Sequence, residues 1–327
     1  MAIGTYLSAL ARDGKFSGTV LARSHGTTLV DSAYGYADRE RQRASSTDTA
    51  FQLASVSKQF TAAAIVLLRE RGKLSIDDRL SRWLPGSPPA WQPITIHQLL
   101  THTSGAGHWE DYPDLSLFQP RAREDLIGTF FARDLRFPVG STWYYSSPAY
   151  VLLAHIVEQA SDERYAEFLQ ENIFRPLGMS QTSVGDDPPA EVPVALGYSG
   201  EKRAASFDLD TVGIGAGDIW STTHDVTRWI EGLAGHEVLN ASSVTAMWTR
   251  HANTTHGDEG YGYGWMVETI NDHPLIGHTG GNAGFTSFDA WLPDQRTSVV
   301  LLCNDDTVNP GEIGMHMVRR VLGAPQA

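Results

Sequence analysis

A serine and a lysine three positions apart are the first residues in this sequence whose types and spacing could do chemistry. Ser55 and Lys58 immediately precede an apolar helical pattern at residues 60–68, so their side chains would lie one turn apart on one helix face. A serine hydroxyl is a poor nucleophile until a neighbouring base takes its proton, and a lysine held away from water can be neutral enough to help. The spacing therefore predicts a nucleophilic serine with a lysine partner.

The same spacing occurs again at Ser199 and Lys202, and the surrounding residues separate the two pairs. Lys202 lies in a polar, glycine-containing stretch, whereas Lys58 lies in an apolar segment that directly follows a strand-like one. Lysine is scarce in this chain, so a lysine inside an apolar segment is unusual. We therefore expect the reactive pair to be Ser55 and Lys58.

Two further segments carry polar groups at the predicted ends of a helix and of a strand. The sequence Tyr-Tyr-Ser-Ser at 144–147 begins a helical pattern, which places a phenol at a helix start. The sequence His-Thr-Gly-Gly at 278–281 ends a predicted strand, and its glycines let another backbone or a substrate approach closely. Both segments would add polar groups to a site around the serine.

The elements that must position these residues follow from the spacing of apolar side chains. A repeat at i, i+3 and i+4 predicts helices, and runs of alternating β-branched and aromatic residues predict strands. The predicted helices cover residues 3–10, 60–68, 150–157, 165–173, 226–233 and 313–321. The predicted strands cover residues 16–23, 27–36, 265–270, 275–278, 285–292 and 298–303.

This order of elements predicts an α+β protein whose antiparallel sheet is built from both ends of the chain. Residues 1–60 and 206–327 would form the sheet subdomain, and residues 61–205 would form a mostly helical insertion, the two parts making one domain. A cleft between a sheet edge and a helical cap is a common place for a site.

In combination, these motifs resemble the serine β-lactamase and penicillin-binding-protein superfamily, in its class C β-lactamase-like branch. The sequence Leu-Leu-Thr-His-Thr-Ser-Gly at 99–105, a small-residue turn at 215–222 and a hairpin between 277–281 and 301–304 extend the match from about residue 16 to residue 322. That branch also contains D-stereospecific peptidases, carboxylesterases and acyltransferases. The resemblance implies a β-lactamase/transpeptidase-like fold and a reaction through an acyl-enzyme.

The resemblance also assigns roles to individual residues. Ser55 would attack the acyl carbonyl, Lys58 would help to deprotonate it, and Tyr145 would pass the proton to the leaving group. The pKa of Tyr145 would be lowered by nearby Lys58, and Tyr144 is the alternative phenol. The backbone N–H groups of Ser55 and Gly281 would form the oxyanion hole.

Two positions depart from the pattern of many relatives. His278, expected as a further catalytic residue, stands where many of them carry lysine, and a histidine there is typical of the esterase and peptidase members. Ser147 stands where an asparagine usually hydrogen-bonds the substrate amide, which favours an ester or a specialised amide. The expected substrate-binding residues are Ser147, Thr279, Gly280, Trp109, Tyr112 and Trp143.

Composition excludes several other classes of protein. The 25 Lys and Arg against 38 Asp and Glu give a net charge of −13, which argues against a nucleic-acid partner. No apolar run is long enough to span a membrane, and the lone Cys303 excludes a disulfide framework. The first 16 residues lack the segments of a signal peptide, so we expect the cytoplasm, or the periplasm or exterior if one was removed.

The expected function is that of a serine hydrolase that needs no metal or cofactor and acts on a small ester or amide. A carboxylesterase or amidase is favoured, and transfer of the acyl group to another acceptor is a variant of the same chemistry. The alternatives are a D-stereospecific peptidase, a β-lactamase and, in a different class, an inactive relative that binds peptides or peptidoglycan. The oligomeric state is left open.

Overall fold

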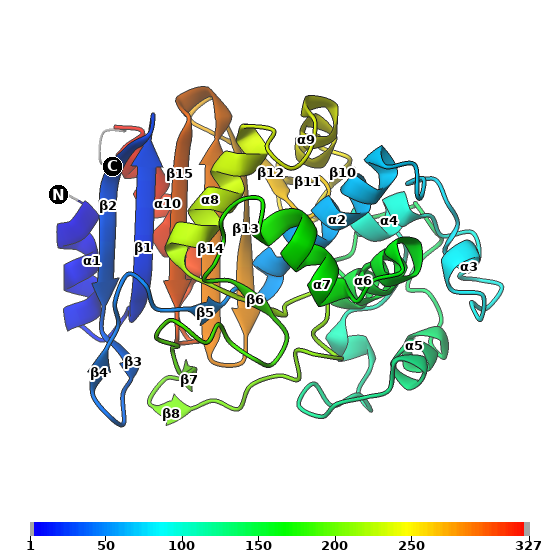
Figure 1. The fold of residues 1–327 in the computed structure, drawn as a ribbon, viewed down its shortest axis with the longest axis horizontal. Coiled ribbons are helices and arrows are strands. Elements are labelled where there is room, and N and C mark those ends of the chain that lie inside the picture. Colours follow the sequence, from blue (N-terminus) through cyan, green and yellow to red (C-terminus); the bar gives the residue numbers. More distant parts are fainter. Residues whose placement is uncertain (1–2, 324–327) are drawn as a thin grey trace.

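An eight-stranded antiparallel sheet forms the centre of the computed structural model, which describes residues 3–323 (Figure 1). Its strand order is β10-β11-β12-β13-β14-β15-β1-β2, so strands from the two ends of the chain pair side by side, with β1 against β15. The strands are β1 (Gly18–Ser24), β2 (Thr27–Tyr34), β10 (Ala252–Asn253), β11 (Gly260–Tyr261), β12 (Met266–Ile270), β13 (His273–Asn282), β14 (Phe285–Leu292) and β15 (Thr297–Cys303).

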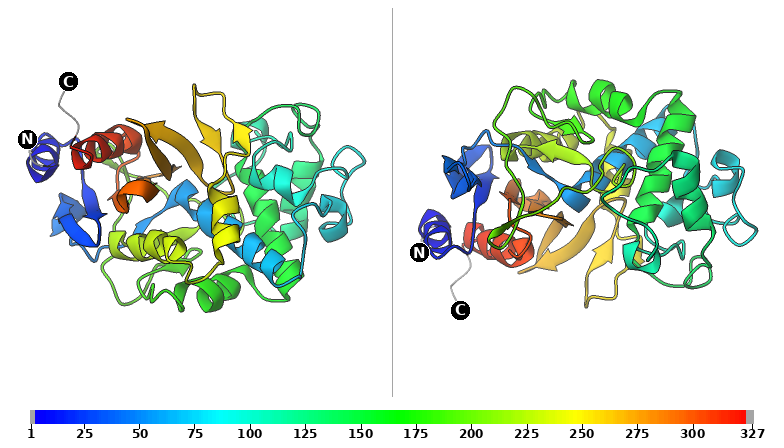
Figure 2. Two further views of the ribbon diagram at one scale, coloured as in Figure 1. Left: turned by 90° about the horizontal axis from the view of Figure 1, so that it is seen from above. Right: turned by 90° about the horizontal axis from the view of Figure 1, so that it is seen from below.

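Helices cover both faces of this sheet, which explains why β15 is buried along its whole length and apolar from Val299 to Cys303. Val299, Leu301 and Cys303 pack towards α1 (Ile3–Arg12) and α10 (Pro310–Val321). Val300 and Leu302 lie in the other core, towards α8 (Thr223–Ala234). Figure 2 shows α8 and α10 on opposite sides of the sheet. A strand buried on both faces loses the simple alternation of a half-exposed one.

The helical part of the chain lies beside one edge of the sheet, on the right in Figure 1. Its centre is α2 (Lys58–Glu70), which packs against α6 (Ser147–Ser161) and is buried over most of its length because its neighbours surround it. The other helices are α3 (Leu80–Trp83), α4 (Ile96–Leu100), α5 (Arg123–Phe131), α7 (Tyr165–Leu169) and α9 (Ala241–Trp248), with the short helical turns η1 (Ala54–Ser57), η2 (Trp109–Asp111), η3 (Gln170–Phe174) and η4 (Pro293–Gln295).

Short strands complete the structure away from the main sheet. A small three-stranded sheet has the order β5 (Phe51–Gln52), β9 (Ile219–Ser221), β6 (Ser183–Val184). It connects the segment before η1 to the turn at residues 213–218, which directly precedes β9. The remaining pairs are β3 (Tyr36–Asp38) with β4 (Arg43–Ala44) and β7 (Tyr198–Ser199) with β8 (Lys202–Arg203).

The predicted fold class and its antiparallel sheet from both chain ends are confirmed. Several strand boundaries differ from the prediction by one or two residues, and one differs by more. Strand β13 does not end at His278 but continues to Asn282, so the His-Thr-Gly-Gly segment lies within the strand. The glycines misled the assignment because they favour turns, whereas here pairing with β14 holds them extended. The division at residues 61 and 206 stays a prediction. Among the described residues, no helix has the length and apolar character needed to cross a membrane.

Candidate active site

Ser55 lies in the one-turn helix η1, which the surrounding backbone holds in a strained conformation. Ala54, directly before it, has φ of +48°, a left-handed conformation that costs free energy in a residue other than glycine. The preceding residue is fixed on both sides, because Leu53 N–H donates to the Ile219 carbonyl at 2.7 Å and its own carbonyl accepts from Ser287 Oγ at 2.6 Å. These contacts present Ser55 at a defined position.

Strand β13 passes very close to η1, and Gly280 makes this approach possible. A Cβ atom at position 280 would lie 2.4 Å from the Leu53 carbonyl oxygen, 2.3 Å from Ser287 Oγ and 3.0 Å from the Ser55 nitrogen. At Gly281, by contrast, a Cβ atom would meet nothing within 4 Å, because that residue faces an open hollow. The predicted close approach at these glycines is therefore present, at Gly280.

Lys58 begins helix α2 and is completely buried beside Ser55. Its Nζ atom lies 3.1 Å from Ser55 Oγ, 3.1 Å from Ser147 Oγ and 2.7 Å from the Ala216 carbonyl oxygen. The carbonyl can only accept a hydrogen bond, whereas either hydroxyl can donate or accept. A neutral Lys58 can therefore keep its bond to Ala216 and still turn its lone pair towards a serine proton.

The surroundings of Lys58 favour this neutral form. Burial lowers the pKa of Lys58 to about 7, and attraction to the carboxylate of Asp218 only partly opposes the shift. Asp218 is itself buried, with a pKa raised to about 7 by burial, and its Oδ2 accepts the Gly215 N–H at 2.8 Å. At neutral pH a substantial fraction of Lys58 can accept a proton.

Tyr145 lies just before α6, with its ring 5.0 Å from Lys58 Nζ. Its hydroxyl is buried and has no hydrogen bond of satisfactory geometry to any described residue. The predicted lowering of its pKa by Lys58 was wrong, because burial raises the pKa of this phenol, and the nearby Ser55 hydroxyl only partly offsets the effect. Tyr145 is therefore a neutral phenol at pH 7 and can give a proton rather than take one.

A ring of aromatic and histidine side chains holds Tyr145 in place. His102 lies 4.5 Å from it between ring centroids, and His102 Nδ1 accepts the Ser146 N–H at 3.1 Å. Ser146 in turn caps α6, because its Oγ accepts the Ala149 N–H. His102 thus fixes the backbone that carries Tyr145. Tyr144 points elsewhere: its hydroxyl donates to Glu110 and Asp111.

His278 is buried near Tyr145, and both of its ring nitrogens are engaged. Nδ1 lies 2.5 Å from the Thr279 carbonyl oxygen, so it must carry the proton, and Nε2 accepts from the Tyr261 hydroxyl at 3.0 Å. Burial, with the nearby charge of Lys58, lowers the pKa of His278 to about 3. The ring is therefore neutral and does not offer a positive charge for gripping a carboxylate.

Two hollows meet at Ser55. A cavity of about 150 Å³ has mostly apolar walls, among them Trp109, Phe207 and Val212. An open cleft of about 790 Å³ runs along the other side, past Tyr145 and Trp143. Three residues border both hollows: Ser55, His108 and Gly281.

The predicted substrate-binding residues divide between these hollows. Trp109 and Ser147 line the apolar cavity, whereas Trp143, Thr279 and Gly280 line the open cleft. Tyr112 lines neither hollow: it is buried in the hydrophobic core, with its ring 5.2 Å from that of Phe130. The prediction for Tyr112 was wrong because the sequence alone does not show whether an aromatic residue near a motif packs in the core or contacts the substrate.

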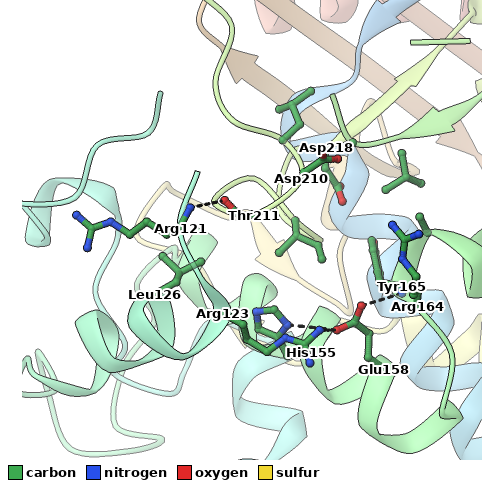
Figure 3. Close-up of a pocket in the computed structure, with 15 residues that line it drawn as sticks. Arg121, Arg123, Leu126, His155, Glu158, Arg164, Tyr165, Asp210, Thr211 and Asp218 are labelled. Atoms are coloured by element: carbon green, nitrogen blue, oxygen red, sulfur yellow. Dashed lines mark hydrogen bonds and ion pairs between the residues drawn. The ribbon is translucent and has the colours of Figure 1, made fainter. Parts of the chain in front are cut away.

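Another cavity, of about 270 Å³, is lined in part by Asp218, the carboxylate that acts on Lys58 (Figure 3). Asp210 and Asp218 lie on one side of it, facing His155 and Glu158 on the other. The Oδ1 atom of Asp218 is buried without a hydrogen-bond partner among the described residues. Asp218 thus forms part of the wall between this cavity and Lys58. In the sequence it was noted only as part of the small-residue turn at 215–222, without a role of its own.

The second Ser-x-x-Lys pair is far from this arrangement. Ser199 and Lys202 are exposed and face each other across the β7–β8 hairpin, and neither borders the two hollows at Ser55. Within residues 3–323, no group of three histidine, cysteine, aspartate or glutamate side chains is placed to hold a metal ion. Of the two Ser-x-x-Lys pairs, only Ser55 and Lys58 combine a serine hydroxyl with a buried amine and a nearby phenol.

Comparison with known proteins places the chain in a family. The beta-lactamase family model matches residues 5–324. A penicillin-binding protein of Bacillus subtilis is 30% identical over 92% of this chain and 71% of its own length, and esterase EstB of Burkholderia gladioli is 28% identical over 93% and 89%. The crystal structure of a penicillin-binding protein from Bacillus halodurans has a TM-score of 0.85 at 29% identity, covering 97% of this chain and 99% of the other.

The chain therefore belongs to the beta-lactamase family. The expected family, fold and general class of enzyme, a serine hydrolase of β-lactamase-like type, are confirmed by these relatives. They do not test which side chains act, and the assignments to Ser55, Lys58, Tyr145, His278 and Gly281 stay predictions supported by the geometry above.

Proposed function

We propose that this protein hydrolyses small esters or amides through an acyl-enzyme on Ser55. The observation that carries the proposal is the contact of Ser55 Oγ with a buried lysine amine, 3.1 Å away, whose pKa is lowered to about 7. A nucleophile beside a base that is neutral near the working pH has the arrangement that nucleophilic catalysis needs. The hollows on both sides of Ser55 leave room for a substrate.

The proposed reaction begins with transfer of the Ser55 proton to Lys58 Nζ as Ser55 Oγ bonds to the acyl carbon. The bond from that carbon to the leaving oxygen or nitrogen then breaks as Tyr145 gives its proton to the leaving atom. Tyr145 recovers a proton from the Lys58 ammonium, whose Nζ lies 5.0 Å from the phenol ring centre. Water repeats the sequence in reverse to release the acid.

The positions of the two hollows suggest how the substrate lies. The leaving group must be next to the proton donor, and Tyr145 borders only the open cleft. The acyl group would then enter the apolar cavity of about 150 Å³, which suits a short chain. The N–H groups of Ser55 and Gly281 remain our candidates for the oxyanion hole, because both residues border each hollow.

Within this scheme His278 acts on Tyr145 by position rather than by proton transfer. Its two ring nitrogens are already bonded to Thr279 and Tyr261, and its ring centroid lies 6.0 Å from that of Tyr145. His278 was expected as a further catalytic residue, and in this scheme it is a positioning residue instead. It also favours substrates without a free carboxylate at this place, because a neutral imidazole offers no ion pair.

Turnover of a small substrate panel tests the proposal. The panel contains p-nitrophenyl esters of increasing chain length, a D-alanyl anilide and a chromogenic cephalosporin. We expect a short-chain ester to have the highest kcat/KM, because the acyl cavity is small and apolar and Ser147 replaces the usual asparagine. A cephalosporin turned over faster than every ester would instead favour a β-lactamase, and a preferred D-alanyl anilide would favour a D-stereospecific peptidase.

An inactive binding protein is the alternative from a different class. A fluorophosphonate probe separates it from the enzyme, because labelling requires an activated serine. We expect labelling of Ser55, and unlabelled protein that still binds peptidoglycan fragments would support the alternative. The strained Ala54 favours the enzyme, as does the Tyr145 hydroxyl, which has no hydrogen-bond partner among residues 3–323, since a binding protein gains nothing from either.

A further inference from the structure

The cavity of about 270 Å³ in Figure 3 contains a buried acceptor that no described residue serves. Asp218 is fully buried on its wall, and its Oδ1 atom has no hydrogen-bond partner within residues 3–323. The other carboxylate oxygen already accepts the Gly215 N–H at 2.8 Å. A buried polar atom without a partner is costly, so Oδ1 points to an occupant of the cavity that donates to it.

A second buried side chain with a free acceptor borders the cavity from the facing wall. His155 is 4% exposed, and neither of its ring nitrogens makes a hydrogen bond of satisfactory geometry in the described part of the chain. Its Nδ1 atom lies 3.5 Å from Glu158 Oε2, and because a carboxylate only accepts, a neutral ring carries its proton on Nδ1. Nε2 is then an acceptor, so this side chain also needs a donor.

The arginines at this cavity are already engaged, so they do not neutralise its aspartates. Arg123 is paired with Glu158, and Arg164 lies 3.7 Å from Glu167. Arg121 donates to a backbone carbonyl, and Figure 3 shows its guanidinium directed away from the other labelled side chains. None of these three guanidinium groups forms an ion pair with an aspartate that lines the cavity.

The aspartates therefore remain as unpaired negative charge on one side of the cavity. Asp210 lies at its exposed mouth and Asp218 on its buried wall, and neither forms an ion pair within the described residues. Burial and, to a smaller extent, repulsion from Asp210 raise the pKa of Asp218 to about 7. Lys58 attracts Asp218 from the other side of this wall without contacting it. A positive ion that donates hydrogen bonds would serve both the charge and the unpartnered oxygen.

We propose that this cavity binds a small organic ammonium ion, whose N–H groups donate to Asp218 Oδ1, with His155 Nε2 as the acceptor on the facing wall. An alkylammonium ion carries one positive charge, three N–H donors and no acceptor, which matches the free groups of the cavity. A volume of about 270 Å³ holds an ion of a few carbon atoms together with water, which takes up about 30 Å³ per molecule. Asp218 borders neither hollow at Ser55, so this site is distinct from the substrate site.

An ion bound here would be sensed at the active site, because Asp218 also acts on Lys58. The bound charge offsets the attraction that favours protonated Lys58, so the acidic limb of kcat/KM should move to lower pH. The other titratable or charged side chains that face Asp218 are Asp210, Tyr165 and, across the cavity, Arg123, His155, Glu158 and Arg164. This consequence rests on the proposed function, and hydrolysis of an amide there would itself release an ammonium ion.

Isothermal titration calorimetry with propylammonium chloride tests the binding. Titrations near pH 8 keep Asp218 ionised, because its pKa is raised only to about 7, and phosphate buffer avoids a buffer that is itself an ammonium ion. We expect one saturable site with a Kd of about a millimolar or below, since an ion this small has few atoms with which to bind. The uncharged 1-propanol should bind at least about tenfold more weakly.

Three substitutions that each remove one negative charge locate the ion. Asp218→Asn keeps the size of the side chain and an acceptor for the Gly215 N–H, but it turns an N–H group towards the cavity. Asp210→Asn removes the charge at the mouth and leaves the buried wall unchanged. Asp187→Asn is the matched control, because this exposed carboxylate belongs to the same acidic region but does not line the cavity. We expect binding to weaken at least about tenfold in D218N and about two- to fivefold in D210N, and to stay within about twofold of the wild type in D187N.

The inference is overturned if no saturable heat is measured, if 1-propanol binds as tightly, or if D218N and D210N both bind as the wild type does. The cavity then holds water alone. Saturating propylammonium should also move the acidic limb of the wild type to lower pH, relative to sodium chloride at equal ionic strength. A limb that moves as far in D218N, or that does not move in the wild type, overturns the link to Lys58. Calorimetry uses no substrate, so a complete lack of ester turnover would overturn the proposed function and leave the binding result to decide this inference.

Discussion

Lys58 has the least ordinary surroundings of any residue in the candidate site. Its amine is fully buried and contacts one carbonyl and two hydroxyls, and it forms no ion pair with a carboxylate of the described residues. The histidines around it, His102, His108 and His278, have pKa values lowered by burial and are neutral. Asp218 is therefore the main negative charge that acts on this lysine.

The pH dependence of activity should follow Lys58. The protonated amine cannot accept a proton from Ser55, so kcat/KM should rise with pH through a value near 7, the pKa to which burial lowers Lys58. Asp218→Asn removes a charge that raises this pKa, so the acidic limb of the profile should move to lower pH. Profiles of kcat/KM for both proteins check this, and a limb that stays in place or moves to higher pH contradicts it.

Tyr145→Phe should separate catalysis from stability. A poor leaving group, such as an alkoxide or an anilide, needs a proton, so kcat for these substrates should fall by about 10²–10⁴. A p-nitrophenolate leaving group needs little help, and its ester should lose less than about tenfold. The free energy of unfolding should stay the same or rise, because the buried hydroxyl has no partner among the described residues. Equal losses for both leaving groups, or a clear destabilisation, would argue against a proton donor.

Among the elements, the contact between η1 and β13 controls the geometry of the site. Gly280→Ala places a Cβ atom 2.4 Å from the Leu53 carbonyl and 2.3 Å from Ser287 Oγ, so one of the two elements must move. We expect a loss of about 1–3 kcal/mol in the free energy of unfolding, the usual cost of overpacking, with a large loss of kcat/KM. Denaturant unfolding and ester turnover measure both.

Gly281→Ala is the matched control for stability. It is the next residue on β13, and its Cβ atom would meet nothing within 4 Å. Its free energy of unfolding should stay within about 0.5 kcal/mol of the wild type, as for other surface positions. Equal free energies of unfolding for the two alanine variants would mean that the close approach of β13 to η1 does not exclude a side chain at position 280.

The elements that sequence could predict are those with a strong apolar period. Helices α2 and α6 and strands β1, β14 and β15 were found where expected. The end of β13 was missed, because pairing with β14 overrides the turn preference of Gly280 and Gly281. The short strands β5, β6 and β9 were also missed, since two or three residues carry no measurable period and pair only because the tertiary structure brings them together.

The site was predictable where a local motif places a side chain and not where the fold does. Ser55 and Lys58 are neighbours on one turn, so their contact follows from spacing. His108 and Asp218 interact electrostatically with Lys58 only because tertiary packing brings them near it. No motif marked His108, and Asp218 was noted only as part of the small-residue turn at 215–222. The sign of the Tyr145 pKa shift was missed for a related reason: sequence suggests a nearby charge, but the depth of burial decides the direction.

At the scale of the whole molecule, the site depends on joining distant parts of the chain. The Lys58 amine touches residues that are 89 and 158 positions away, Ser147 and Ala216. Strands from both chain ends form the sheet that contains β13 (Figures 1 and 2). Helix α2 carries the base Lys58, and the phenol of Tyr145 lies just before helix α6. Activity and folded structure should therefore be lost together on unfolding, and no fragment of the chain should be active on its own.

The whole protein should need neither a metal nor a particular redox state. The proposed reaction takes its base from Lys58 and its proton donor from Tyr145, and Cys303 is buried with its thiol pKa raised to about 11. Incubation with EDTA, with a reductant or with iodoacetamide should leave ester turnover unchanged. Loss of activity on chelation that zinc restores would overturn the assignment of Lys58 as the base.

The proposed acyl-enzyme reaction depends most directly on which serine carries the acyl group. Intact-mass spectrometry after brief exposure to a slowly turned-over acylating substrate measures this on three proteins: wild type, Ser55→Ala and Ser199→Ala. We predict an adduct of the acyl mass on the wild type and on Ser199→Ala, and none on Ser55→Ala, whose kcat should also fall by at least about 10³. An adduct that persists on Ser55→Ala and disappears from Ser199→Ala would contradict the account.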